Sequence, residues 1–204
     1  MLRLFIVRHG VTIWNSEGRL QGHTDVPLSE EGLAQADMVA YRLSGEKLNA
    51  VYSSDLQRAK ITGEKIAALH GLSVHMDPIL RETMLGEWEG MTRDEIMRSS
   101  DETLFKQYRL DPMAYRPPGA EPLEQVWERM LAALQMIRDA HPQGSVAVVG
   151  HGGSLRVLLC SALGAPINSL RKIWLDNVSV SLIEYAEDRA WVRLMNDTCH
   201  LHSK

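Results

Sequence analysis

The chain has 204 residues, 45% hydrophobic and 24% charged, which is typical of a single globular domain over residues 1–204 with room for an insertion. Its net charge is −4 and no basic patch is evident, so the composition gives no indication of a nucleic-acid partner. The N-terminal apolar stretch is too short for a signal peptide or a membrane span, and two cysteines supply at most one disulfide, so we expect a cytoplasmic protein with no membrane partner.

The first part of the chain alternates apolar runs with amphipathic helical patterns. Branched apolar residues predict short buried strands at 2–7, 50–54 and around 72–76. Between them we expect two helices, one capped by Ser29 and one capped by Asp55. In these helices Leu33 and Leu69 are expected to face the core.

Residues 81–120 break this alternation. The segment contains several glycines and prolines between short helical pieces, so we expect a helical insertion over the site rather than sheet. The alternation then returns, and the predicted elements are a helix at about 121–140, a strand at 145–149, a helix at 155–163 and a terminal hairpin at about 178–185 and 190–195.

Together these elements predict an α/β fold, a three-layer, doubly wound and mainly parallel sheet with helices on both faces. In such sheets, ligands bind at the carboxyl ends of the strands. His9 follows the first predicted strand, and His151 follows the strand at 145–149. The two histidines are therefore expected to lie at one edge of the sheet, although they are far apart in the sequence.

The residues around His9 suit an anionic ligand. A neutral imidazole is a good nucleophile near pH 7, and the guanidinium of Arg8 matches the geometry of phosphate oxygens. Gly10 would let a ligand approach the backbone closely. Arg58 lies in the first turn of the helix after the second strand, so we expect it to face the same edge of the sheet.

Two further candidates follow from position. His151 lies between glycines at a helix N-terminus, where free N–H groups and the helix dipole attract anions. A carboxyl group at the start of the insertion would be placed to donate a proton to a leaving oxygen. On spacing alone, Glu82, Glu87 and Glu89 cannot be separated for this role.

In combination, these motifs resemble the histidine phosphatase superfamily, in its phosphoglycerate-mutase-like branch. The matching segments occur in the family's order and cover nearly the whole chain. They are VRHGVTIWN at 7–15, LQG at 20–22, LSEEG at 28–32, YSSDLQRA at 52–59, RE at 81–82, GEWEG at 86–90 and VGHGG at 149–153.

The resemblance implies a phosphate pocket of Arg8, His9, Arg58 and His151, in which His9 is the residue phosphorylated and Glu82 is the general acid. Further substrate contacts are implied for Asn15, Gln21, Gly22 and the backbone near Gly152. No metal or other cofactor is expected, because Arg8, Arg58 and a protonated His151 would supply the positive charge that phosphoryl transfer needs.

We therefore expect a metal-independent hydrolase of a small phosphate ester, as a monomer or a homodimer. The main alternative is a phosphoglycerate mutase. A mutase benefits from a long insertion that keeps water from the phosphoenzyme, but here only 38 residues separate Glu82 from Glu121. The mutases that this chain resembles are generally longer, which favours a hydrolase. A non-catalytic anion-binding module is a third alternative, and the complete set of site residues argues against it. The sequence does not choose among phosphoserine, α-ribazole phosphate, 3-phosphoglycerate and a broad range of esters as the substrate.

Overall fold

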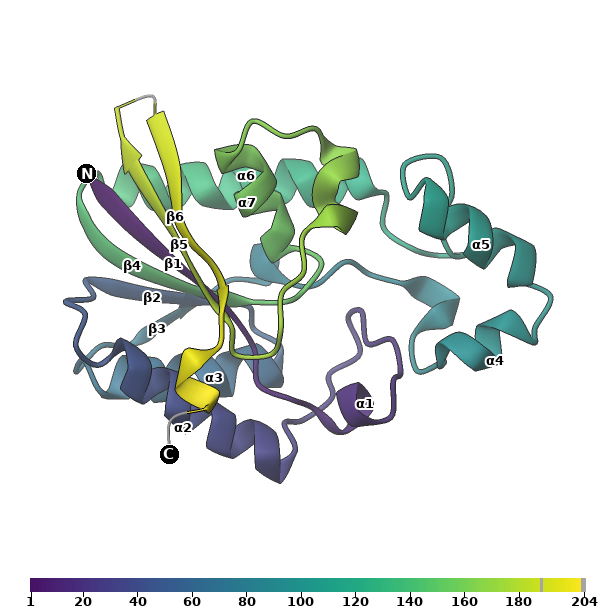
Figure 1. The fold of residues 1–204 in the computed structure, drawn as a ribbon, viewed down its shortest axis with the longest axis horizontal. Coiled ribbons are helices and arrows are strands. Elements are labelled where there is room, and N and C mark those ends of the chain that lie inside the picture. Colours follow the sequence, from purple (N-terminus) through teal and green to yellow (C-terminus); the bar gives the residue numbers. More distant parts are fainter. Residues whose placement is uncertain (188, 203–204) are drawn as a thin grey trace.

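A computed structural model describes residues 1–187 and 189–202, and its strands form one mixed sheet. The strands are β1 (Leu2–Arg8), β2 (Ala50–Ser53), β3 (Val74–Met76), β4 (Gly144–Gly150), β5 (Val180–Ala186) and β6 (Arg189–Asp197). Their order across the sheet is β3-β2-β4-β1-β5-β6 (Figure 1). The first four in this order are parallel, and β5 and β6 continue the sheet as an antiparallel hairpin. The predicted mainly parallel sheet and the terminal hairpin are thus confirmed.

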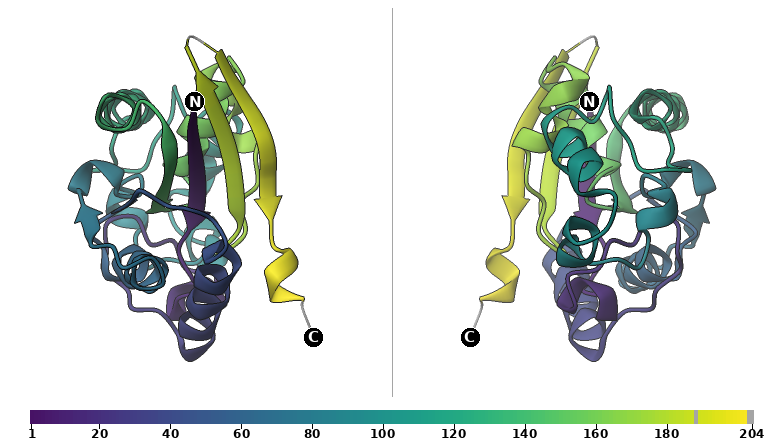
Figure 2. Two further views of the ribbon diagram at one scale, coloured as in Figure 1. Left: turned by 90° about the vertical axis from the view of Figure 1, so that its left-hand side faces the viewer. Right: turned by 90° about the vertical axis from the view of Figure 1, so that its right-hand side faces the viewer.

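Helices cover both faces of the sheet, as predicted (Figure 2). One face is covered by α2 (Glu30–Leu43) and α3 (Gln57–Ala68), and the other by α6 (Leu123–Ala140) and α7 (Leu155–Ala162). The shorter helices α1 (Ile13–Ser16), α4 (Arg93–Met97) and α5 (Glu102–Leu110) lie outside these two layers (Figure 1). Side chains alternate along β1, so that Leu4 and Ile6 join the core under α6 and α7, whereas Phe5 and Val7 join the core under α2 and α3. Because the sheet is buried on both faces, only its edges and strand ends are open to a ligand.

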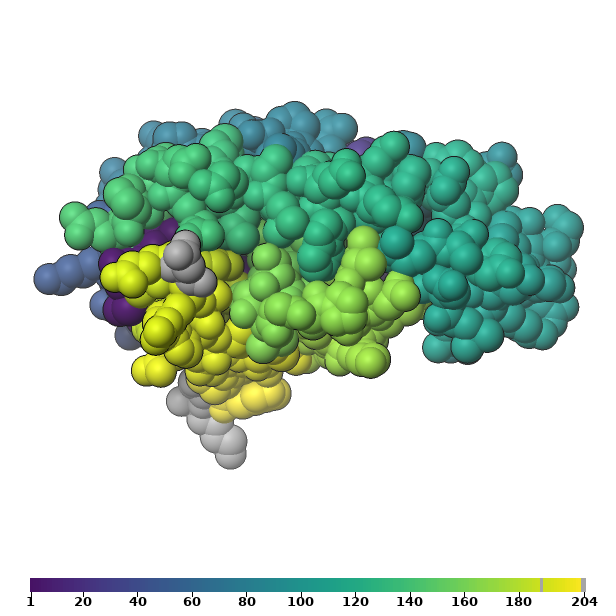
Figure 3. All heavy atoms as spheres, turned by 90° about the horizontal axis from the view of Figure 1, so that it is seen from above, coloured from purple at the N-terminus to yellow at the C-terminus, as the bar shows by residue number. Residues whose placement is uncertain are grey.

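The segment between β3 and α6 forms the expected helical insertion. It contains α4 and α5 and has its own small apolar cluster of Trp88, Ile96 and Phe105. From above, this part of the chain forms a lobe at one end of the molecule (Figure 3). No helix among the residues described is long and apolar enough to cross a membrane.

The predicted cap of α2 is confirmed, but three details of the helices are wrong. Ser29 accepts a hydrogen bond from the backbone of Gly32 at 3.0 Å. Asp55 does not cap α3, because its carboxylate is held by the guanidinium of Arg81 at 2.7 Å, and Leu56 occupies the cap position. Leu33 and Leu69 point outward, with 39% and 54% of their surface exposed. Finally, α6 begins at Leu123 rather than near residue 121, because Pro122 has no N–H and stands at the cap.

Candidate active site

The two histidines predicted from strand ends lie side by side. His9 follows β1 and His151 follows β4, and these strands are parallel neighbours. The backbone N–H of His9 donates to the carbonyl of Gly150 at 2.9 Å, which ties the two strand ends together. The imidazole centroids are 5.2 Å apart with the rings tilted by 59°, and both side chains are buried. The two strand ends therefore bring both rings to one edge of the sheet.

The His9 ring has one nitrogen occupied and one available. Its Nδ1 lies 2.7 Å from the carbonyl oxygen of Gly10, and a carbonyl can only accept, so Nδ1 carries the proton. Burial, followed by the charges of Arg8 and Arg58, holds the pKa of His9 well below its usual 6.5. The ring is therefore neutral near pH 7, with an unprotonated Nε2 that can act as a nucleophile.

His151 has the opposite arrangement. Its Nδ1 accepts a hydrogen bond from Nε of Arg58 at 3.2 Å, so in the neutral ring the proton is on Nε2. That Nε2 is buried and has no partner among the described residues. Burial and the charge of Arg58 also hold the pKa of His151 well below 6.5. The expectation that His151 is protonated is wrong for the free protein, in which it offers a neutral N–H donor.

Two arginines supply the positive charge of the site. Arg58 is fully buried, and its two terminal nitrogens donate to the carbonyls of Gly22 and Thr24, each at 2.8 Å. Arg8 donates to the carbonyl of Leu175 at 2.7 Å, and burial lowers its pKa to about 10. In the part of the chain that the structure describes, neither guanidinium pairs with a carboxylate. Glu82 lies near enough to interact with both charges but forms no ion pair with either, so both guanidinium groups stay available to an anionic ligand rather than a metal ion.

The structure separates the three glutamates that spacing left equivalent. Glu82 accepts hydrogen bonds from the backbone N–H groups of Gly153 and Ser154, at 2.8 and 2.9 Å, at the start of α7. A side chain at Gly153 would collide with this carboxylate, so only glycine leaves room for it. Glu89 instead binds the loop at 22–24, and Glu87 is exposed. Of the three, only Glu82 lines the cavity that contains His9.

The remaining predicted residues surround this cavity, which has a volume of about 280 Å³. Asn15, Gln21 and Gly22 line it together with Arg8, His9, Arg58 and Glu82. Gly22 adopts a positive φ of 54°, which turns its carbonyl toward Arg58. The Oε1 of Gln21 is buried and has no partner among the described residues. His151 and Gly152 are not part of the cavity wall, and Gly152 lies against the side chain of Arg8.

Three residues near the site were not found from the sequence. Arg129 on α6 donates to the carbonyls of Arg81 and Glu82, at 2.8 and 2.9 Å, and so fixes the start of the insertion. Asn177 donates to the carbonyl of His9 at 2.9 Å. Arg156 lines the cavity from the first turn of α7. The reasoning that pointed to Arg58, a first helical turn after a strand, applies equally to Arg156, but no sequence pattern marks the other two.

Comparisons with known proteins agree with this geometry. The histidine phosphatase superfamily (branch 1) matches residues 4–198. Phosphoserine phosphatase 1 of Hydrogenobacter thermophilus is 35% identical over 201 residues, covering 98% of this chain and 95% of that protein. A probable phosphoglycerate mutase GpmB of Yersinia pestis is also 35% identical, over 206 residues with the same coverage. The solved structure of Bacillus stearothermophilus YhfR has a TM-score of 0.92 and 34% identity, covering 98% of this chain and 100% of its own.

Proposed function

Because the chain belongs to branch 1 of the histidine phosphatase superfamily, we propose that it is a metal-independent phosphatase that hydrolyses small phosphate monoesters through a phosphohistidine at His9. One observation carries this proposal. A buried, neutral imidazole with an available Nε2 lies beside two arginines that have no carboxylate partner among the described residues, and a carboxyl group from the insertion lines the same cavity.

In the first step, the phosphoryl oxygens of the ester bind to Arg8, Arg58 and the Nε2–H of His151. Nε2 of His9 attacks phosphorus in line with the leaving oxygen, so that a P–N bond forms as the P–O ester bond breaks. Glu82 gives a proton to the leaving oxygen, and the alcohol departs. These donors are in place before the substrate arrives, which lowers the cost of reorganisation in the transition state.

In the second step, a water molecule takes the place of the alcohol. The carboxylate of Glu82 removes a proton from the water as its oxygen attacks phosphorus. A P–O bond forms, the P–N bond breaks, and inorganic phosphate leaves with His9 returned to its neutral form. Dividing the hydrolysis into two transfers replaces one difficult step with two easier ones.

A rapid-quench labelling experiment tests the proposal. Brief exposure to ³²P-labelled substrate should give protein-bound phosphate that is labile in acid and stable in base. His9→Ala should abolish the label, whereas His202→Ala, at an exposed histidine far along the chain, should keep it. If His9→Ala is labelled as well as the parent protein, the nucleophile is not His9.

The mutase alternative has one specific observation in its favour, the similarity to the probable phosphoglycerate mutase of Yersinia pestis. The same phosphohistidine serves a mutase, which returns the phosphoryl group to the substrate instead of to water. Reaction with 3-phosphoglycerate, with and without 2,3-bisphosphoglycerate, separates the two. We expect phosphate release to exceed isomerisation. Rates of phosphate release from a panel that includes phosphoserine and α-ribazole phosphate then show which alcohol is preferred.

A further inference from the structure

A second cavity adjoins the one that contains His9. It has a volume of about 340 Å³, which is within the range of small-molecule sites. Six residues line both cavities, namely Leu20, Thr83, Leu85, Tyr108, Gly153 and Arg156. The two cavities therefore share a wall and lie next to each other, so that the far end of a molecule with its phosphate at His9 would be directed toward the second one.

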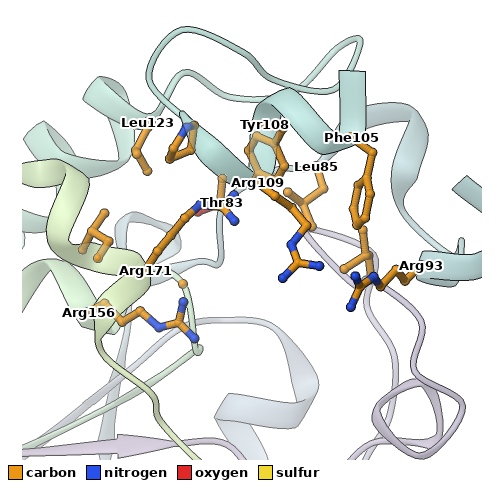
Figure 4. Close-up of a pocket in the computed structure, with 13 residues that line it drawn as sticks. Thr83, Leu85, Arg93, Phe105, Tyr108, Arg109, Leu123, Arg156 and Arg171 are labelled. Carbon is orange, nitrogen blue, oxygen red and sulfur yellow. The ribbon is translucent and has the colours of Figure 1, made fainter. Parts of the chain in front are cut away.

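Four arginines line this second cavity, which we call the arginine pocket. Arg93 and Arg109 come from α4 and α5 in the insertion, Arg156 comes from α7, and Arg171 comes from the short helix at Ile167–Lys172. Figure 4 shows these side chains reaching the cavity from both sides. The lining contains neither aspartate nor glutamate.

The charge of the arginine pocket is not balanced by the protein. In the described residues, none of its four guanidinium groups is within 4.0 Å of a carboxylate. The Nε of Arg156 is buried and likewise has no hydrogen-bond partner among these residues. Four unpaired cations around one cavity repel one another, and this is unexpected in a chain whose net charge is −4. An anionic ligand would relieve the repulsion.

Two of the four arginines are held by aromatic contacts. The guanidinium of Arg171 lies over the ring of Tyr108, 4.5 Å from its centroid, and Tyr108 packs edge-on against Trp88 at 5.5 Å. The guanidinium of Arg156 lies 6.0 Å from the ring of Trp174. Such stacking restricts the side chains while leaving their N–H groups available to a ligand.

The rest of the wall is apolar. Leu85, Phe105, Pro112, Leu123 and Leu170 line the cavity beside the arginines. Phe105 packs against the buried Trp88 at 5.3 Å in the insertion's own core, whereas Leu170 belongs to the core under α6 and α7. A ligand that fills the cavity thus meets apolar side chains as well as guanidinium groups.

We propose that the alcohol part of the substrate carries a second anionic group, a carboxylate or a phosphate, joined to the reacting phosphate through an apolar spacer, and that the arginine pocket binds this group. The inference rests on the proposed function, since it assumes that the reacting phosphate lies at His9. The preferred substrates are then small esters that carry the reacting phosphate at one end and a second anionic group at the other. A neutral alcohol would leave the guanidinium groups unpaired.

Matched synthetic substrates test this proposal. The acids 4-phosphooxybutanoate and 6-phosphooxyhexanoate are compared with their N-methyl amides, which have the same length and lack the second charge. Hexane-1,6-diol bisphosphate tests whether a phosphate is preferred to a carboxylate. We expect kcat/KM for an anionic substrate to exceed that for its amide by at least about tenfold, because guanidinium groups bind an anion more strongly than a neutral amide. The preference should weaken as salt is added.

Variants connect the preference to the arginine pocket. In the double variant Arg109→Gln, Arg171→Gln, the ratio of kcat/KM between acid and amide should fall by at least about threefold, with Arg93 and Arg156 keeping the remainder. Arg109→Lys should keep part of the preference because it keeps the charge. The control Arg98→Gln, at an exposed arginine of the insertion that does not line the pocket, should keep all of it.

The outcomes also separate this inference from the proposed function. If acid and amide are hydrolysed equally well with labelling of His9, the arginine pocket does not recognise an anion, while the phosphatase proposal stands. An acid preference that is undiminished in the double variant, or that Arg98→Gln lowers equally, also overturns the inference. If no ester is hydrolysed, p-nitrophenyl phosphate included, it is the proposed function that fails.

Discussion

His9 and His151 differ in which nitrogen carries the proton, and this difference suits them to different tasks. The carbonyl of Gly10 fixes the proton of His9 on Nδ1, whereas Arg58 fixes that of His151 on Nε2. Both rings stay neutral because burial and nearby arginines lower their pKa values. One ring therefore offers a lone pair to the site and the other offers an N–H group.

The tautomers are open to direct measurement. In ¹⁵N NMR spectra of the free protein, we expect His9 as the Nδ1–H form and His151 as the Nε2–H form, assigned through the variants His9→Gln and His151→Gln. Both should remain neutral at a pH well below 6.5, because the cationic form of each buried ring is disfavoured. A cationic signal for either residue near pH 6 would contradict this account.

Arg58 links the charge of the site to its loop. It contacts His151 through Nε and the backbone of Gly22 and Thr24 through its terminal nitrogens. We expect Arg58→Ala to lower kcat/KM for p-nitrophenyl phosphate by about 10²–10³, the usual cost of losing one preorganised donor to a developing anion. Arg58→Lys should restore only part of the lost kcat/KM, since an ammonium group cannot reach all three hydrogen-bond partners.

The matched control for Arg58 is Lys60→Ala, on the same helix, whose one ion pair among the described residues is with Glu64 at 3.9 Å. It should change kcat/KM by less than about twofold, because such surface pairs contribute little. Thermal unfolding of each variant shows whether a loss of activity reflects a loss of fold. A fall of less than tenfold in well-folded Arg58→Ala would mean that this guanidinium is not part of the phosphate clamp.

At the scale of elements, the start of α7 positions Glu82, the general acid that we propose. Glu82 comes from the insertion, but its carboxylate is held by backbone N–H groups at the N-terminus of a helix more than 70 residues further along the chain. This arrangement uses donors that a helix cannot satisfy internally. It also explains why glycine stands at position 153, where a side chain would occupy the space of the carboxylate.

Gly153→Ala tests this arrangement. The added methyl group should displace Glu82, so kcat should fall by about tenfold or more for alkyl phosphates, whose leaving oxygen needs a proton. The fall should be smaller for p-nitrophenyl phosphate, whose leaving group is stable as an anion. Gly45→Ala, where an added Cβ meets no atom within 4 Å, is the control and should behave like the parent protein. Equal losses for both substrate types would argue against Glu82 as the acid.

Across the whole molecule, the buried histidines make the folded state sensitive to acid. Their pKa values are lowered in the folded protein and return to about 6.5 in the unfolded chain, so below pH 6.5 the unfolded chain binds protons first. The stability contributed by the neutral rings is therefore present above that pH and is lost as the pH falls. Each ring contributes a slope of up to about 1.4 kcal/mol per pH unit.

We expect the free energy of unfolding, measured with urea between pH 6 and pH 5, to fall less steeply in His9→Gln than in the parent protein. The difference in slope should approach about 1.4 kcal/mol per pH unit. Between pH 7.5 and 8.5 the free energies of unfolding of His9→Gln and of the parent protein should differ by a constant amount, because His9 and His151 are neutral in both the folded and the unfolded protein. Parallel curves over the acidic range would show that His9 is protonated equally in the folded and unfolded protein.

Much of the fold follows from local patterns in the sequence. The apolar runs and helical stripes predicted the parallel strands, the helices on both faces and the terminal hairpin, because burial on both faces of a sheet requires such runs. The errors concern the helix ends and the exposure of Leu33 and Leu69, which depend on residues that are close in space but distant in the sequence. Asp55 is one example, since the side chain expected to cap α3 pairs instead with Arg81 from the insertion.

The sequence by itself placed His9, Arg8, Arg58 and His151 at one edge of the sheet, because the carboxyl ends of parallel strands meet there. Only the tertiary structure decided that His151 is neutral, that Glu82 rather than Glu87 or Glu89 faces the cavity, and that four arginines surround a second cavity beside it. The reason is physical. Burial, the choice of hydrogen-bond partner and the balance of charge depend on residues that are distant in the chain, and no local pattern records those distances.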